Sequence, residues 1–446
     1  MEKANGQRIT LKACFLGMVV IIGGFMFGYV SGQISGYFNM SDYADQFSSN
    51  GTFSSSRQGA IIGLLSVGCL FGAPIIGQVV NWIGRRMSIC LSAFWSCVGI
   101  IIEISSQHAW YQFAIGRFVT GLSISASSVS VSMYESESAP VVIRGMLISC
   151  YQFFVTLCIW VSNMVNWGTH KSYHNSAQWR VTNGLVGREE EAREIIVGYA
   201  GVDIHHPSLE EENSVADVKW HEIFTGPRMM YRTNLSMVLM AGQQLTGINY
   251  YFYYGTTVFQ STGLTDSYVT QIILRAVNII STFPGLWVAH NWGRRTGLTV
   301  GAVWMMVCFS IYAFVGQLKL DLDDPSKTSG VGKVLTGFAC LDMFAFAATW
   351  GPLAWTLIVE LYLTRYRGSC MAIASTTNWL WNFLIGSCNT PYITREIDFY
   401  YGLVFAAACG CLALIVFFCL IETKGRSLEE IDTTHLQHVN PITSQV

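Results

Sequence analysis

Long apolar runs alternate with short polar loops along most of the chain. An α-helix needs about 20 mainly apolar residues to cross a bilayer. Eleven runs meet this criterion, near 13–36, 59–80, 88–105, 111–133, 146–167, 233–259, 269–289, 297–317, 333–359, 370–390 and 399–421. A polar stretch separates the fifth run from the sixth. The pattern predicts an all-α membrane protein whose helices form two groups.

The same pattern divides the chain into four parts. We expect an N-terminal transmembrane bundle at 1–167, with five readable spans, and a C-terminal bundle at 233–421, with six. Residues 168–232 are predicted to form a polar, mainly cytoplasmic linker with short helices, because REEEAREII at 188–196 has the i,i+4 charge pairs of a solvated helix. Residues 422–446 are predicted to be a short cytoplasmic tail.

Two motifs occur once in each group of spans. GRR stands at 84–86 and again at 293–295, each time in the turn after an apolar run. A glutamate is followed by Arg-Gly within 137–145 and again within 360–368. The two groups are therefore predicted to be copies of one unit, related by an axis normal to the membrane.

The distribution of positive charge indicates that one crossing is missing. Cytoplasmic loops are enriched in Lys and Arg. When the N-terminus and the loop 187–232 are both placed inside, inner loops hold 17 of the 26 Lys and Arg. The fifth span then ends outside while the next begins inside. Trp179 and Arg180, with the short VTNGLV after them, look like the start of a helix that does not continue, so we expect that a segment has been lost here.

Composition excludes several classes of protein. The chain is 51% hydrophobic and 12% charged, against about 25% charged residues in a soluble globular chain. A net charge of −2 gives no indication of a nucleic-acid partner. The 13 cysteines lie mostly in apolar runs without ligand-like spacing, so we expect no metal site and no cofactor. No nucleophile with a base and no phosphate loop appears, which argues against an enzyme.

The most unusual stretch is QQLTGINYYFYY at 243–254, within an apolar run. Lipid offers no hydrogen bonds to amides and phenols, so these side chains must face protein or water. On a continuous helix Gln243, Gly247 and Tyr250 share one face, whereas Asn249 lies about 120° away from it. Either Asn249 serves another contact, or the helix is interrupted near Gly247, as transporter helices often are at substrate sites.

Several motifs in combination resemble one known family. They are FGYVSGQISG at 27–36, GRR at 84–86, GRFVTGL at 116–122, SESAPVVIRG at 136–145, QQLTGINYYFYY at 243–254, GRR at 293–295, WGPLAW at 350–355, NWLWNF at 378–383 and ETKG at 422–425. With them the chain resembles the sugar porter family of the major facilitator superfamily, most like fungal hexose transporters. The resemblance implies two pseudo-symmetric six-helix bundles around a sugar site that opens alternately to either face. By this count we expect the chain to lack the sixth family helix.

The resemblance also implies a sugar site. The matching positions carry amide or indole groups: Gln152, Gln243, Gln244, Asn249, Asn278, Trp355 and Asn378. Amides both donate and accept hydrogen bonds, as sugar hydroxyls do, and an indole ring stacks on the apolar face of a pyranose. By contrast, Asn163, Asn166 and Asn382 are expected to hold helices together, and Trp379 and Trp381 to serve packing.

The same resemblance implies an outer gate and a set of inner-face ion pairs, which close the site toward either side of the membrane. Tyr253 and Tyr254 match the outer gate of the family. Ion pairs that hold the bundles shut on the inner face are matched by Arg85, Arg86, Glu137, Arg144, Arg294, Arg295, Glu360 and Arg367.

Ionisable residues within the spans bear on energy coupling. Arg117, Arg275 and Asp342 all fall in apolar runs. In proton-coupled relatives an aspartate of the first span pairs with the arginine matched by Arg117, but here Val30 holds the aspartate's position. Since valine cannot titrate, facilitated diffusion is favoured over proton symport.

These features together predict a multi-pass transporter of a hexose such as glucose, embedded in the lipid bilayer of the plasma membrane and monomeric. One alternative is a non-transporting sugar sensor, which the short tail after the last span disfavours. The other is an inactive variant, because loss of a helix leaves the faces of its neighbours unpaired.

Overall fold

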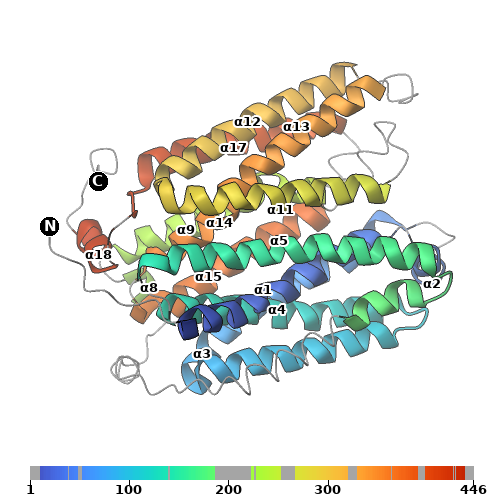
Figure 1. The fold of residues 1–446 in the computed structure, drawn as a ribbon, viewed down its shortest axis with the longest axis horizontal. Coiled ribbons are helices and arrows are strands. Elements are labelled where there is room, and N and C mark those ends of the chain that lie inside the picture. The colour runs from blue at the N-terminus through green and yellow to red at the C-terminus, as the bar shows by residue number, and fades with distance from the viewer. Residues whose placement is uncertain are drawn as a thin grey trace.

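The computed structural model describes residues 11–38, 40–48, 53–138, 141–185, 222–225, 228–252, 267–319, 329–362, 364–389, 397–424, 426 and 428–436. Within these ranges the secondary structure is helical throughout, without a strand. The helices run roughly side by side along the longest axis of the molecule (Figure 1). The predicted all-α fold is therefore confirmed.

The N-terminal bundle consists of long helices that pack in pairs. Its members are α1 (Leu11–Tyr37), α3 (Ser55–Ser105), α4 (Trp110–Ser138) and α5 (Val141–Ser172), with the short α2 (Ser41–Phe47) beside the end of α1. Helix α3 packs along α4, and α1 along α5. Helix α3 contains two of the predicted spans, divided at Gly84, whose φ of 79° and ψ of 162° are not helical. The first GRR motif therefore begins at a sharp kink.

The C-terminal bundle has more breaks along its helices. Its elements are α8 (Glu222–Thr225), α9 (Met229–Leu245), α11 (Ser267–Asn291), α12 (Arg294–Lys319), α13 (Ser329–Ala348), α14 (Trp350–Glu360), α15 (Thr364–Phe383), the π-helix η2 (Leu384–Asn389), the 3₁₀ turn η3 (Asp398–Tyr400), α17 (Tyr401–Cys419) and α18 (Leu428–Leu436). Helices α13 and α14 divide one predicted span at Thr349, whose backbone is not helical.

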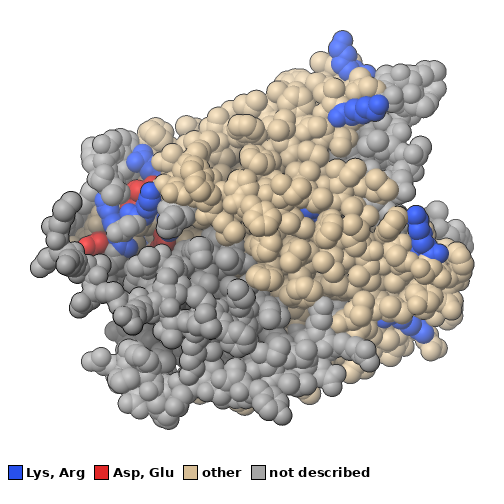
Figure 2. Space-filling view, in the orientation of Figure 1, with Lys and Arg blue, Asp and Glu red and all other residues tan. Residues whose placement is uncertain are grey.

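Seven helical segments of the described chain are long and apolar enough to cross a membrane. They are Ser56–Ile76, Met87–Ser105, Trp110–Val131, Gln271–Ala289, Arg294–Lys319, Gly330–Glu360 and Tyr401–Cys419. Charged side chains gather toward the two ends of the face in Figure 2, and its middle is almost entirely uncharged. This is the distribution that a bilayer requires, although the count of eleven spans stays a prediction.

The chain after α5 begins a further helix. Residues 177–185 are helical, and Trp179 is fully buried among Tyr43, Phe47 and Phe113. Asn183 accepts hydrogen bonds from Gln33 at 2.7 Å and from Tyr37 at 3.1 Å. This segment therefore packs as part of the N-terminal bundle, in line with the prediction of a helix start at Trp179. Residues 186–221, most of the predicted linker, lie outside the described residues.

The two bundles meet along two pairs of helices. Helix α5 contacts α11, and α3 contacts α15, so the blue-green and the yellow-orange halves lie against each other (Figure 1). Ser66 of α3 donates a hydrogen bond of 2.8 Å to Asn382 at the end of α15. The boundary between the bundles is thus a surface with buried polar groups, and the site lies on it.

Candidate functional site

A cavity of about 960 Å³, including its mouth, lies between the bundles. From the N-terminal bundle it is lined by Phe27, Ser31, Ser128, Tyr151, Gln152, Val155 and Ile159. From the C-terminal bundle it is lined by Gln243, Gln244, Ile248, Asn249, Phe252, Arg275, Phe346, Trp355, Asn378, Trp379 and Asn382. Six of the seven predicted sugar-binding residues are therefore brought together here.

A break in the helix after the end of α9 places Asn249 at the cavity. Helix α9 ends at Leu245, and Gly247 has a φ of +83°, which only glycine adopts at low cost. The chain is helical again over 248–252. Of the two alternatives for Asn249, the structure therefore shows the second, a helix that is interrupted near Gly247.

The break also changes the direction of the tyrosines. Tyr250 and Tyr251 do not line the cavity; Tyr251 stacks on Phe309 with ring centroids 5.3 Å apart, and Tyr250 packs against Phe405. The prediction that Tyr250 shares a face with Gln243 assumed a continuous helix, and it is wrong because the rotation restarts after Gly247.

Asn378 of α15 connects the two glutamines. Its Nδ2 donates to Gln243 Oε1 at 2.9 Å, and its Oδ1 accepts from Gln244 Nε2 at 2.8 Å. Gln243 Nε2 in turn donates to the Trp350 carbonyl at 3.0 Å. All three side chains are buried. Because each amide holds another, their orientations are defined before any ligand binds.

Gln244 Oε1 accepts hydrogen bonds from two further amides. It accepts a short hydrogen bond from Asn249 Nδ2 and one of 3.2 Å from Asn382 Nδ2. An amide oxygen has two lone pairs, so both contacts satisfy it. The resulting network is neutral and offers both donors and acceptors to a polyhydroxylated ligand.

Trp355 and Gln152 also line the cavity. Trp355, on α14, is partly exposed to the cavity, and Gln152 reaches it from α5. An indole beside amides is the combination that grips a pyranose, with stacking on one face and hydrogen bonds at the edge.

Three predicted residues are not seen at the cavity. Asn278 of α11 is buried but is not among the lining residues, and its Oδ1 has no hydrogen-bond partner in the part of the chain that the structure describes. Tyr253 and Tyr254, the predicted gate, lie outside the described residues.

Some lining residues were not predicted. Asn382 was expected to hold helices together; it does so through Ser66, but it also lines the cavity. Trp379, expected to serve packing, lines the cavity too, and Arg275 lies over the Phe252 ring at 4.0 Å. The NWLWNF motif could have indicated that these residues line the cavity, because Asn382 follows Asn378 by four residues and Trp379 by three, which puts it on the same helix face as each of them. By contrast, Asn163 and Asn166 of α5 donate to the Gly32 and Gln33 carbonyls of α1, at 3.5 and 2.8 Å, and so hold the two helices together as expected.

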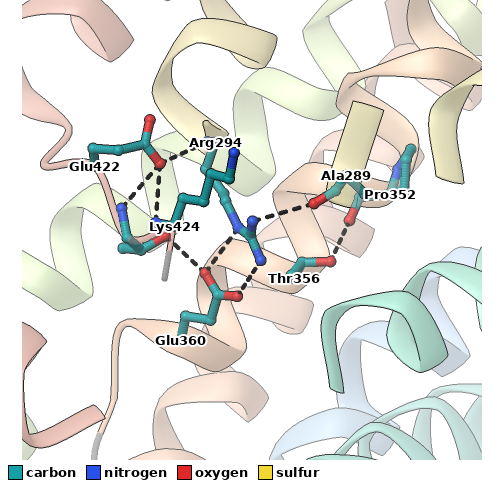
Figure 3. A network of polar contacts seen from close by, with 8 residues as sticks. Ala289, Arg294, Pro352, Thr356, Glu360, Glu422 and Lys424 are labelled. Carbon is teal, nitrogen blue, oxygen red and sulfur yellow. Dashed lines mark hydrogen bonds and ion pairs between the residues drawn. The ribbon is translucent and has the colours of Figure 1, made fainter. Parts of the chain in front are cut away.

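An ion pair joins α12 to α14 in the C-terminal bundle. Arg294 of α12 binds Glu360 of α14 through two hydrogen bonds, from Nε to Oε2 at 3.2 Å and from Nη2 to Oε1 at 2.7 Å (Figure 3). Both side chains are largely shielded from solvent. Glu422 accepts from the backbone N–H of Arg294 at 2.8 Å, which caps α12. The ETKG motif therefore ties the end of α17 to this pair.

The remaining inner-face residues divide into two groups. Arg295 donates to the Phe417 carbonyl, from Nη2 at 2.6 Å, and Arg367 donates to the Tyr362 carbonyl at 3.3 Å. The inner-face residues of the N-terminal half are Arg85, Arg86, Glu137 and Arg144. Their side chains lie outside the described residues. The expected ion pairing is thus observed for Arg294 with Glu360, and it stays a prediction for the rest.

Comparison with solved structures shows the fold. The major facilitator superfamily proton:xylose symporter XylE with bound 6-bromo-6-deoxy-D-glucose matches with a TM-score of 0.77 at 21% identity, over 94% of this chain and 98% of that one. An inward open conformation of XylE from E. coli matches with a TM-score of 0.71 at 21% identity, over 94% of this chain and 99% of that one. The predicted major facilitator fold is confirmed.

Comparison with sequences shows the family. The chain is 39% identical to the high-affinity glucose transporter ght5 of Schizosaccharomyces pombe, over 98% of this chain and 86% of that protein. It is 38% identical to the low-affinity glucose transporter HXT1 of Saccharomyces cerevisiae, over 98% of this chain and 84% of that protein. A family model described as "Sugar (and other) transporter" matches in two pieces, residues 16–187 and 184–435, which meet where the sequence predicts a lost segment. With the amide-lined cavity between two bundles, these matches show that the chain belongs to the sugar transporter family of the major facilitator superfamily.

Proposed function

We propose that this chain carries a hexose such as glucose across the plasma membrane by alternating access. Its family makes it a multi-pass membrane protein of sugar transport, not an enzyme. Relatives of 37 to 39% identity are named as transporters of glucose, fructose, galactose and hexoses, which favours a hexose as the substrate.

The observation that carries the proposal is the network of Gln243, Gln244, Asn249 and Asn378 on the cavity wall. A sugar hydroxyl both donates and accepts, and these amides can exchange partners with it at little net cost, because every hydrogen bond lost within the network is replaced by one to the sugar. In the proposal Gln152 and Trp355 hold the opposite side of the pyranose, and Asn278 joins when α11 moves.

Alternating access needs a closure on each side. We assign the outer gate to Tyr253 and Tyr254, and the inner closure to Arg294 with Glu360 and the corresponding residues of the N-terminal half. Substrate binding then favours the occluded state by the difference in affinity between the two conformations. The transporter acts as a monomer, because each chain holds a whole cavity.

Facilitated diffusion is the proposed mode. Val30 of α1 is buried and offers no titratable group; only its backbone carbonyl is engaged, accepting from Arg117 Nη1 at 3.2 Å. With no carboxylate at this position, the proton-binding member of the Asp–Arg pair of proton-coupled relatives is absent here, which favours facilitated diffusion.

The test is uptake of radiolabelled D-glucose by cells that lack other hexose transporters. We expect saturable uptake, and Gln243→Ala and Trp355→Ala should each raise the apparent Michaelis constant by about tenfold or more, since a lost hydrogen bond or stacking contact at a buried site is worth about 1–2 kcal/mol. If both variants match the unaltered chain at equal surface expression, the assignment of the site fails.

A second candidate is an inactive variant, which the interrupted family match at 184–187 favours. The alignment to the S. pombe glucose transporter runs over 478 positions whereas the chain has 446 residues, so at least 32 positions lie opposite gaps in this chain. A lost helix would leave faces of α1 and α5 unpaired. A chain that reaches the cell surface and takes up no sugar would establish this candidate.

A further inference from the structure

Glu103 is a buried carboxyl group that the sugar site does not use. It lies near the end of α3 at 1% exposure. Its Oε1 accepts a hydrogen bond of 3.0 Å from Thr120 Oγ1, and its Oε2 has no hydrogen-bond partner in the described chain. A Cβ at Gly116 would lie 2.6 Å from Glu103 Cγ, so this glycine of α4 makes room for the side chain. The site holds the carboxyl group but satisfies it only in part.

Arg117 is a buried cation that directly follows Gly116, the glycine against which Glu103 packs. It belongs to α4, it is 1% exposed, and its Nε has no hydrogen-bond partner among the described residues. No ion pair within 4.0 Å joins it to Glu103 in this part of the chain. Instead its Nη1 donates to the Val30 carbonyl of α1 at 3.2 Å. The guanidinium thus ties α4 to α1.

Helix α1 connects this hydrogen bond to the cavity. Phe27 and Ser31, on either side of Val30 in the sequence, line the cavity wall. A change in the hydrogen bond at Val30 therefore acts on residues that face the sugar.

Two charged groups lie at the same end of the bundle: Arg180, whose Nη2 donates to the Ser106 carbonyl just after Glu103, and Asp42 of α2, which accepts from Trp179 beside Tyr43. Other titratable groups interact with the pair directly. They are Tyr37 of α1 and Tyr43 of α2, which face both Glu103 and Arg117, Tyr29 of α1, which faces Tyr37, and Cys69 of α3, which faces Arg117. Burial raises the pKa of the Tyr43 hydroxyl well above its ordinary value, so Tyr43 stays neutral. Of the two carboxyl groups named here, Asp42 is only partly buried and Glu103 is buried.

We propose that Glu103 is a positioning residue for transport, whose protonation sets the affinity for the hexose through Arg117 and α1. When Glu103 is neutral, Arg117 remains on the Val30 carbonyl and α1 keeps its place at the cavity. When Glu103 ionises, its carboxylate attracts the buried guanidinium, because two opposite charges at low dielectric interact strongly. Arg117 then leaves the carbonyl, and the wall formed by Phe27 and Ser31 loosens.

The position of the pair favours control by external pH. Glu103 and Arg117 lie near the end of the bundle that carries α2, which the distribution of positive charge predicts to be outside. The proton exchanges with one side only in this account, so it regulates facilitated diffusion and is not carried with the sugar. The inference rests on the proposed function.

The experiment measures glucose exchange by the full chain in proteoliposomes, with the lumen buffered and the external pH varied from about 4 to about 8, across the range where carboxyl groups titrate. We expect the apparent Michaelis constant of the unaltered chain to rise about threefold to tenfold with pH, the effect of losing one hydrogen bond of ordinary strength. Glu103→Gln, which stays neutral, should keep the low value at every pH, with the maximal rate little changed.

Two further variants keep the test decisive if Glu103→Gln does not fold. Thr120→Val removes the donor to Oε1 and so should move the midpoint of the profile to higher pH, because a carboxylate gains more from that hydrogen bond than a neutral acid does. Asp342→Asn is the matched control. Asp342 is a fully buried carboxyl group of α13, in the other bundle, and its loss should leave the midpoint in place.

The outcomes separate the two proposals. If the Michaelis constant of exchange does not change with pH, this inference alone is overturned. The same holds if the pH profile is unchanged in Glu103→Gln or in Thr120→Val, or if its midpoint moves in Asp342→Asn. If the unaltered chain shows no saturable exchange at any pH, the proposed function fails, and this inference fails with it.

Discussion

At the scale of single residues, Asn378 connects the two glutamines of the cavity wall. Its side chain makes one hydrogen bond to each of Gln243 and Gln244, at 2.9 and 2.8 Å. Both glutamines project from α9, whereas Asn378 belongs to α15. The amide of one helix thus sets the orientation of two amides on another.

We therefore predict that Asn378→Ala weakens glucose uptake through its apparent Michaelis constant, by about tenfold or more, because two buried amide atoms lose their partners at about 1–3 kcal/mol each. Kinetics of radiolabelled glucose uptake give the value. Asn163→Ala is the control: Asn163 is a buried amide of α5 that bonds to the Ile159 carbonyl and does not line the cavity. An equal loss of affinity in both variants would contradict the role of Asn378.

At the scale of helices, the decisive feature is the interruption at Gly247. A Cβ there would lie 2.6 Å from Phe309 Cζ and 2.7 Å from Phe405 Cγ, and the φ of +83° disfavours any side chain. The break lets α9 present Gln243 and Gln244 while the segment that follows turns Asn249 to the same cavity. A continuous helix cannot do both.

Gly247→Ala should consequently destabilise the protein, by about 1–2 kcal/mol for the left-handed backbone and about 1–3 kcal/mol for the overpacked aromatic rings. Thermal unfolding of the purified chain measures the effect as a lower Tm. Gly337→Ala is the matched control, since no atom lies within 4 Å of its added Cβ in α13, and it should raise the Tm slightly. A Tm for Gly247→Ala at or above that of the unaltered chain would show that the break is not needed.

How far the sequence predicts this architecture also depends on such breaks. The all-α membrane fold follows from the apolar runs, and the family follows from the combination of its motifs. The amides at 243–249 could be expected to face protein or water because lipid cannot satisfy them. The direction of Tyr250 does not follow from the sequence, because a helical wheel assumes one continuous rotation and tertiary packing around Phe309 and Phe405 interrupts it. The dual role of Asn382 was missed for a related reason: a single amide shows no preference between a neighbouring helix and a cavity until the other bundle is in place.

At the scale of the whole molecule, two helical bundles enclose a neutral network of amides, and the Arg294–Glu360 pair joins α12 to α14 in the C-terminal half. The N-terminal bundle includes the helical residues 177–185, held by Asn183. The cavity draws its wall from both bundles. Relative motion of the bundles therefore changes the site itself, as alternating access requires.

The central claim is that this amide network binds a hexose. Calorimetric titration of D-glucose into the purified full chain tests it most directly. We predict saturable binding by the unaltered chain and an affinity at least about tenfold lower for Gln244→Ala, which removes the oxygen that Asn249 and Asn382 share, a loss of about 1.4 kcal/mol or more. Equal affinity in the two proteins, or no binding to a folded unaltered chain, would contradict the account.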